Sequence, residues 1–254
     1  MNRWISRFTQ VGLSVVCSAW MLGCSGGASP SNGDDAADTE ASGSPIIDGT
    51  IDKGDPGVVL VQFGDSFCTG EVVSAHVVTT AAHCVKGESG WTIDTTYDGS
   101  GSSFKVKEGH YHPKYKGGLG TYDVGVLITE DALDVKPIPL NHRALKSADV
   151  GKSVRIIGYG DATTDGKRYG KRRQATVKLV SYKTNSVTIG NVGSDGKVQC
   201  YGDSGGPALL KIDGVENIIG FDSGNNSDVC DQNDFNTRAD VTTDFIDPYI
   251  EDFN

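Results

Sequence analysis

Basic residues are scarce in this chain relative to acidic ones. Its 254 residues include 23 lysines and arginines against 33 aspartates and glutamates, which gives a formal net charge of -10. A protein of this charge repels a polyanion, so the composition argues against nucleic acid as a partner. The length allows one or two domains and is sufficient to bury a sizeable core.

The sequence also lacks an apolar run long enough to cross a membrane. The N-terminal candidate, residues 8–22, is shorter than the about 20 residues that a transmembrane helix needs. Arg3 and Arg7 precede it, and a short apolar run after positive charge is typical of a secretory signal. The run ends in Met21-Leu22-Gly23-Cys24, which resembles a bacterial lipobox. We expect residues 1–23 to be a signal peptide and Cys24 to be lipidated; the alternative is an ordinary signal with an incidental Cys24.

Aromatic and large aliphatic side chains are absent from residues 25–44, which are rich in Ser, Gly and Asp. Such a segment cannot bury enough apolar surface to offset its ordering entropy. Residues 24–45 are therefore predicted to be a flexible tether or propeptide, with the globular domain at residues 46–254. The predicted destination is the cell envelope as a lipoprotein, or the extracellular medium after release, where disulfides are favoured.

Helical periodicity is nearly absent before the C-terminus. Short β-rich runs broken by Gly, Asp and Asn recur instead, and the 34 glycines are about twice the usual share. The pattern predicts an all-β sandwich or a pair of barrels. One terminal helix is expected from the apolar stripe Val241, Phe245, Tyr249 and Phe253, although Pro248 weakens it. The expected strands are residues 58–63, 71–80, 91–97, 124–128, 154–159, 175–182, 186–189, 208–212 and 217–221.

Three motifs carry reactive side chains. They are Thr79-Thr80-Ala81-Ala82-His83-Cys84, Thr121-Tyr122-Asp123-Val124-Gly125, and Gly202-Asp203-Ser204-Gly205-Gly206-Pro207. A serine hydroxyl needs an adjacent base to act as a nucleophile at neutral pH, and histidine suits that role. A buried carboxylate orients such a histidine, and glycines around the serine let backbone amides turn towards a developing oxyanion. Each motif alone is weak evidence, but together they supply a base, an acid and a nucleophile.

In the order His, Asp, Ser, these motifs resemble the trypsin-like (chymotrypsin-fold) serine proteases. The resemblance extends over residues 46–254: residues 46–50 look like the mature N-terminus of that family, and Gly158-Tyr159-Gly160 looks like its Gly-Trp-Gly turn. It implies two packed six-stranded antiparallel Greek-key barrels with a short C-terminal helix. It also implies a monomeric serine endopeptidase that acts on proteins or peptides without a cofactor. A metal site at His110 and His112 is the less favoured interpretation, because no further ligand cluster is evident.

The resemblance assigns roles to individual residues. His83 is the general base, Asp123 orients it, and Ser204 attacks the carbonyl. The amides of Gly202 and Ser204 form the oxyanion hole, and Ser223 helps to hold Asp123.

Departures from the family leave the primary specificity open. The pocket base falls at Val198, where trypsin has Asp, and Ser223, Gly224 and Asn225 are expected on the wall. Asp222 and Asp234 either make the pocket negative or face solvent, the latter being the common fate of an acidic loop residue.

The six cysteines divide between the segments. Cys17 lies in the signal and Cys24 is the lipid site, so four remain in the domain. The family pairs Cys68 with Cys84 and Cys200 with Cys230. Four cysteines allow three connectivities, so the sequence alone leaves other pairings open.

The resemblance also implies activation by cleavage before Ile46. In the family, a freed N-terminal Ile or Val forms an ion pair with the Asp before the catalytic Ser, here Ile46 with Asp203. Ser44-Pro45 precedes Ile46, so trypsin-type autoactivation after a basic residue is not expected. Other function classes stay open: a non-catalytic protease homologue that acts as a surface binding lipoprotein, a structural or adhesive lipoprotein, and a different hydrolase such as an esterase.

Overall fold

The computed structural model describes residues 46, 49–161, 170–190, 197–226 and 230–253. The chain divides into two units, Met1–Glu40 and Ala41–Asn254, and the fold below is that of the second. The predicted signal, Cys24 and the tether lie outside the described residues. In the part of the chain that is described, no helix is both long and apolar enough to span a membrane.

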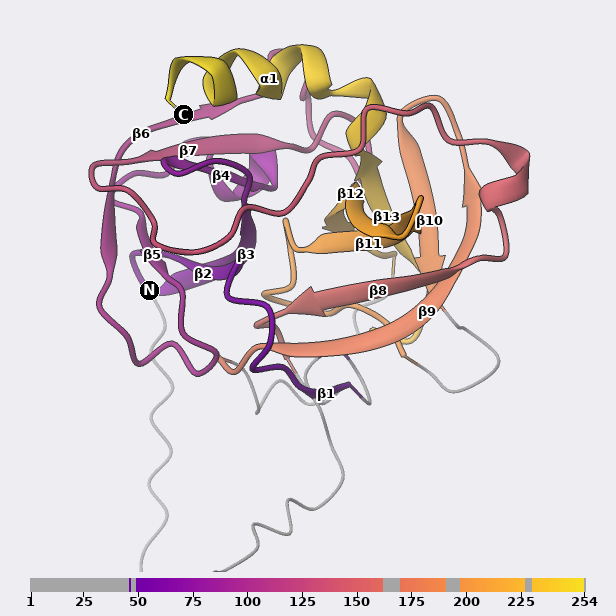
Figure 1. Cartoon of the computed structure of the whole chain (residues 1–254), viewed down its shortest axis with the longest axis horizontal. Helices are drawn as coiled ribbons and strands as arrows, with labels where there is room; N and C mark the ends of the chain where they lie inside the picture. The colour runs from indigo at the N-terminus through magenta and orange to yellow at the C-terminus, as the bar shows by residue number, and fades with distance from the viewer. Residues whose placement is uncertain (1–45, 47–48, 162–169, 191–196, 227–229, 254) are drawn as a thin grey trace, which may run out of the picture. The chain divides into compact units, whose positions relative to one another are not determined.

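Six strands close into the first barrel, drawn in indigo to magenta in Figure 1. The ring runs β2-β3-β4-β7-β6-β5, and every neighbouring pair is antiparallel. The apolar run of β2 is continuous because both faces of the strand are buried. Val59 and Val61 face the barrel core, while Val58 and Leu60 face a cluster shared with the second barrel. The strands are β2 (Val58–Phe63), β3 (Ser66–Val72), β4 (Val77–Thr80), β5 (Thr92–Asp94), β6 (Phe104–Tyr111) and β7 (Gly125–Thr129).

The second barrel, rose to yellow in Figure 1 apart from the indigo β1, forms from a seven-stranded sheet in the order β1-β9-β10-β13-β12-β11-β8. An additional pairing of β8 with β9 closes six of these strands, and β1 (Thr50–Ile51) extends the sheet from β9. Alternate residues of β9, such as Val177 and Leu179, face the barrel core. The strands are β8 (Ser153–Gly158), β9 (Arg173–Tyr182), β10 (Ser186–Gly190), β11 (Pro207–Ile212), β12 (Val215–Gly224) and β13 (Asp234–Arg238).

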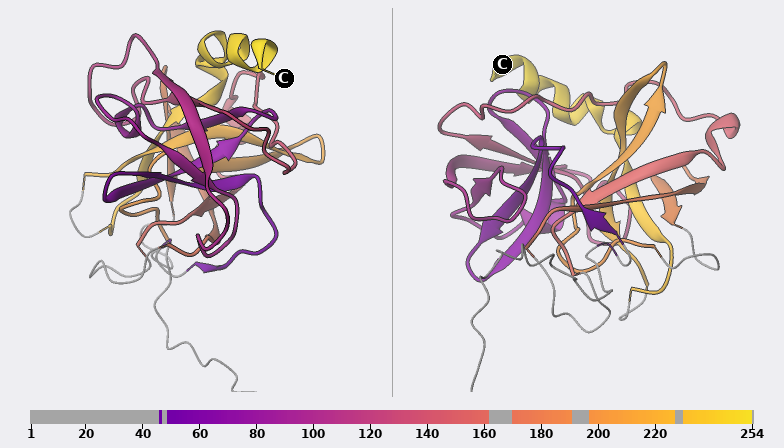
Figure 2. Two further views of the ribbon diagram at one scale, coloured as in Figure 1. Left: turned by 90° about the vertical axis from the view of Figure 1, so that its left-hand side faces the viewer. Right: turned by 60° about the horizontal axis from the view of Figure 1, so that its bottom comes forward.

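Helical turns are few among the described residues. They comprise the 3-10 turns η1 (Ala82–Cys84), η2 (Ser147–Asp149) and η3 (Ala239–Val241), and the helix α1 (Thr243–Asp252). The two barrels lie side by side in Figure 2, and α1 packs on the first barrel although it follows the last strand of the second. His110 stacks on Tyr249 at 4.9 Å between ring centroids, and His112 contacts Phe245 at 5.0 Å. The predicted fold, two six-stranded antiparallel barrels with a C-terminal helix, is confirmed.

Some strand boundaries differ from the sequence prediction. The expected run 71–80 is two strands, β3 and β4, joined by a turn at residues 73–76. Strands β6 and β13 were not predicted. Charged residues alternate with half-buried ones along β6, and β13 carries the buried polar residues Asp234 and Asn236. Neither has the β-branched, apolar composition by which strands are recognised.

Glu71 on β3 is a fully buried carboxyl in the first barrel. Thr79 Oγ1 donates to its Oε2 at 3.1 Å, and no described residue pairs with its Oε1. Burial raises the pKa of Glu71 well above its usual value. The folded state therefore holds this proton more tightly than the unfolded state, so stability is lost as pH rises above about 4.3, the pKa of an unfolded glutamate.

Glu71→Gln is expected to raise the melting temperature at pH 8 and to change it less at pH 4.5, because Gln keeps the shape and avoids ionisation. A domain of this size gains about 2–4 °C for each kcal/mol. Melting curves at both pH values test this, with Glu130→Gln on the exposed surface as the matched control. Equal pH dependence in wild type and Glu71→Gln would contradict it.

Candidate active site

His83, Asp123 and Ser204 come together from three separate segments. His83 lies in η1, which is separated from the end of β4 by one residue, Asp123 lies two residues before the start of β7, and Ser204 lies in the turn that leads into β11. His83 Nδ1 lies 2.8 Å from Asp123 Oδ2, and the His83 backbone N–H donates to Asp123 Oδ1 at 3.0 Å. Asp123 is 2% exposed, whereas the His83 side chain is 37% exposed. One ring nitrogen therefore faces a buried carboxylate while the ring remains accessible.

Both the carboxylate and the backbone of Asp123 are held by further groups. Ser223 Oγ donates to Asp123 Oδ2 at 2.6 Å and accepts from the Gly120 N–H at 2.9 Å. The Asp123 backbone N–H donates to Thr237 Oγ1 at 3.0 Å. The predicted contact of Ser223 with Asp123 is present. The contact of Thr237 was missed, because it belongs to the unpredicted strand β13.

Ser204 and His83 line one cavity of about 440 Å³. Within the described residues, no hydrogen bond joins Ser204 Oγ to His83. Such bonds are often long before substrate binds. The shared cavity places a hydroxyl and an imidazole where one substrate can meet both.

The turn that carries Ser204 depends on its glycines. Gly202 has φ of 92° and Gly205 has φ of 84°, a region that favours glycine. A Cβ at Gly202 would clash with the Phe67 ring, and one at Gly205 would clash with Thr80 Oγ1. Among the described residues, the backbone amides of Gly202 and Ser204 have no hydrogen-bond acceptor. Both donors are therefore free to bind an anionic oxygen.

Asp203 is fully buried beside the same turn. It accepts from the Gly160 N–H at 2.9 Å and from the Cys200 N–H at 2.8 Å. Burial, together with the nearby charge of Asp161, raises the pKa of Asp203 to about 7. Ile46 is fully buried against the second barrel's core, and in the intact chain its nitrogen is bonded to Pro45. The expected ion pair of Ile46 with Asp203 requires cleavage of that bond and stays a prediction.

The walls of the cavity differ in part from expectation. Ser223, Gly224 and Asn225 line it as predicted, but Val198 does not. Val198 is fully buried and packs against Cys200 and Cys230, because its apolar side chain turns into the protein. The lining also includes groups that sequence reasoning did not assign to it: Leu119, Gln199, Tyr201 and Asn226.

Comparison with known proteins then identifies the family. The family model described as Trypsin matches residues 47–246. This chain belongs to the trypsin family. It is 31% identical to a trypsin of Saccharopolyspora erythraea over 60% of this chain and 75% of that protein. It is 28% identical to the trypsin Blo t 3 of Blomia tropicalis over 64% of this chain and 71% of that protein.

Two other matches are a relative that is not named a trypsin and a solved structure. Glucanase inhibitor protein 1 of Phytophthora sojae is 30% identical over 59% of this chain and 63% of that protein. Among solved structures, neuropsin, described as a serine protease of the mouse limbic system, aligns with a TM-score of 0.67. That alignment covers 80% of this chain and 99% of neuropsin at 23% identity, so it bears on the fold alone.

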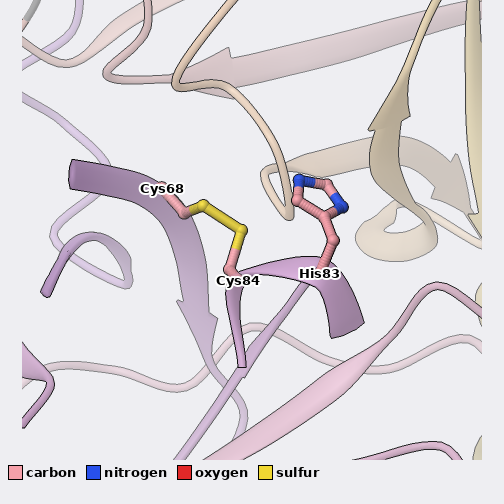
Figure 3. A group of neighbouring side chains, drawn as sticks. All are labelled: Cys68, His83 and Cys84. Atoms are coloured by element: carbon pink, nitrogen blue, oxygen red, sulfur yellow. A yellow bond between two sulfur atoms is a disulfide. The ribbon is translucent and has the colours of Figure 1, made fainter. Parts of the chain in front are cut away.

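The disulfides follow the pairing that the trypsin family implies. Cys68 is joined to Cys84, and Cys200 to Cys230, so the predicted connectivity is confirmed. Figure 3 shows the first bridge beside His83, whose ring projects away from it. Cys68, His83 and Cys84 offer donor atoms within 4.8 Å of one another, but both sulfurs are used in the disulfide. The group therefore presents no thiolate to a metal.

Proposed function

We propose that this trypsin-family chain is an exported serine endopeptidase that works through His83, Asp123 and Ser204. The observation that carries the proposal is the 2.8 Å contact of His83 Nδ1 with buried Asp123, in the cavity that also holds Ser204. His83 takes the Ser204 proton as Ser204 Oγ bonds to the substrate carbonyl carbon. The amides of Gly202 and Ser204 bind the oxyanion.

The same groups complete the cycle. His83 donates its proton to the leaving amine, the peptide C–N bond breaks, and an acyl-enzyme on Ser204 remains. Water then gives a proton to His83 while its oxygen attacks the ester carbonyl, and the proton returns to Ser204 as the acid product leaves. Asp123 keeps the Nδ1–H tautomer and stabilises the imidazolium in both halves.

Activation and release are proposed to be one event. Lipidated Cys24 would hold an uncleaved zymogen at the membrane through residues 25–45. A cut before Ile46 would sever that tether and free the nitrogen of Ile46. N-terminal sequencing of the membrane and soluble fractions tests this order. Fully active protein that still carries residues 25–45 would defeat it.

A second candidate function is binding without catalysis. The relative Glucanase inhibitor protein 1 supports this candidate, since its name denotes an inhibitor. A fluorophosphonate probe that bonds to an activated serine separates the two candidates. The chain is first cut before Ile46 and then tested. If it is labelled and also cleaves a peptide library to give new termini, the result favours the peptidase. If the cut chain is not labelled and does not cleave the peptides, the result favours the binding protein.

A further inference from the structure

One threonine of the first barrel contacts the turn that carries Ser204. Thr69 lies on β3 and is fully buried. Its Oγ1 donates to the Gly202 carbonyl at 2.9 Å, and its backbone N–H donates to the Ser204 carbonyl at 3.0 Å. These bonds reach the turn at the two residues whose amides are free to bind an oxyanion.

The hydroxyl of Thr69 is also an acceptor. The Tyr159 N–H donates to Thr69 Oγ1 at 3.0 Å, so the hydroxyl uses its only proton on Gly202 and a lone pair on Tyr159. The Thr69 carbonyl accepts from Thr80 Oγ1 at 2.8 Å, which ties β3 to the end of β4. Thr69 is therefore held on both sides, and any rotation of its side chain costs a buried hydrogen bond.

The peptide group between Gly202 and Asp203 separates the two free amides. The Gly202 N–H precedes this rigid plane and the Ser204 N–H follows it, so its orientation sets the angle between the two donors. Its carbonyl is bonded by Thr69 Oγ1, and its N–H donates to the Cys200 carbonyl at 2.9 Å. Gly202 has no Cβ to restrict rotation, so these bonds from outside supply the restraint.

The residue before Thr69 fixes the segment that carries the base. Cys68 is bonded to Cys84, which directly follows His83 (Figure 3). Successive side chains of a strand point to opposite faces, so Cys68 turns to its bridge while Thr69 turns to the Ser204 turn. Consecutive residues of β3 thus hold both the base and the nucleophile, whose positions matter to within about 0.5 Å.

We propose that Thr69 is a positioning residue for the oxyanion hole. Its Oγ1 orients the Gly202–Asp203 peptide so that the amides of Gly202 and Ser204 converge on one oxygen. The inference rests on the function proposed above. Thr69 is fully buried and is not among the described residues that line the cavity, so its effect on rate passes through the turn. A role in packing alone would change stability and leave the transition state as it is.

The experiment compares wild type with Thr69→Val, which keeps the shape of the side chain but loses the hydroxyl. The enzyme is the full chain with a site for a specific protease inserted directly before Ile46 and then cut. The expected fall in kcat is about 10- to 100-fold, below the about 10²- to 10³-fold lost with a whole oxyanion donor. KM should stay the same, because the cavity walls are unchanged. Thr69→Ser keeps Oγ and should restore most of kcat.

A pair of inhibitors separates an effect on the oxyanion from an effect on general binding. The peptide of the library that wild type cuts fastest is prepared up to the cleaved bond, ending in an aldehyde or in the corresponding alcohol. Ser204 Oγ adds to the aldehyde and gives a tetrahedral adduct that resembles the transition state, whereas the alcohol binds through ground-state contacts. Thr69→Val should weaken the aldehyde by the factor lost from kcat and leave the alcohol unchanged. Equal weakening of both would overturn the proposal.

Thr129→Val is the matched control. Thr129, at the end of β7, is buried as well, and its Oγ1 donates to the Asp131 carbonyl at 2.7 Å. Its loss should lower the melting temperature but leave kcat and the affinity for the aldehyde unchanged. If Thr69→Val does not fold, Thr69→Ala removes the same hydroxyl without placing a methyl group against the Gly202 carbonyl.

Fluorophosphonate labelling of Ser204 distinguishes failure of this inference from failure of the proposed function. Normal kcat and aldehyde affinity in folded Thr69→Val, or no recovery in Thr69→Ser, would refute only the role of Thr69, since wild type is then still a labelled enzyme. Wild type that is neither labelled nor cleaves the library would refute the proposed function, and the role of Thr69 with it.

Discussion

Ser204→Ala is expected to lower kcat by about 10⁴- to 10⁶-fold while leaving the fold intact. Alanine removes the Oγ that forms the acyl-enzyme, and loss of the nucleophile of a triad costs on this order. The free amides of Gly202 and Ser204 and the cavity walls survive the change, so a small residual rate and ordinary substrate affinity should persist. Single-turnover cleavage of a peptide ester measures the loss in rate. Covalent labelling by a fluorophosphonate shows whether the nucleophile is lost.

The control for this prediction is Ser153→Ala, on the exposed side of β8, which should keep full activity and labelling. His83→Ala should lose labelling as well, because the hydroxyl then has no base. Members of a triad act as a unit, so the double variant should be little worse than either single variant. Retention of activity in Ser204→Ala would mean that another nucleophile, or a contaminating enzyme, performs the cleavage.

The positions of the reactive residues were predictable from sequence because each lies in a short motif with local constraints. His83 ends an apolar strand next to a cysteine, and Ser204 sits among glycines that must adopt positive φ. These constraints act over a few residues and are visible in the linear chain. The contact of Ser223 with Asp123 spans a long sequence separation, and it was predicted only through the family resemblance.

The cavity wall could not be predicted to the same depth. Strand β13 reads as a polar loop because Asp234 and Asn236 disfavour strands in general, yet tertiary contacts hold them in one. Val198 was expected at the pocket base from its position before Ser204, but its side chain packs against the bridged Cys200 and Cys230 in a small apolar cluster. Which side chain faces a cavity depends on local backbone rotation, and spacing along the chain does not determine that rotation.

Cleavage directly before Ile46 is expected to raise activity by about 10²- to 10³-fold. In the uncut chain, the Asp203 carboxyl is held by two backbone amides, and burial raises its pKa to about 7. Cutting frees an ammonium at Ile46 that can move to this carboxyl and hold the oxyanion turn in place. Removing one partner of such a buried pair costs about 3–5 kcal/mol, which sets the size of the effect. The chain with an inserted protease site, assayed before and after cutting, measures it.

The ion pair also has a signature in stability. In the uncut chain the raised pKa of Asp203 means that the folded state binds its proton more tightly, so stability falls as pH rises from about 4 to 7. Pairing with the ammonium of Ile46 keeps the carboxylate ionised and removes this loss. The gain in melting temperature on cutting should therefore grow with pH over that range, and fade above about 8 as the ammonium loses its proton. Asp203→Asn should gain neither activity nor stability on cutting. If Asp203→Asn gained as much as wild type, Asp203 would not be the partner of Ile46.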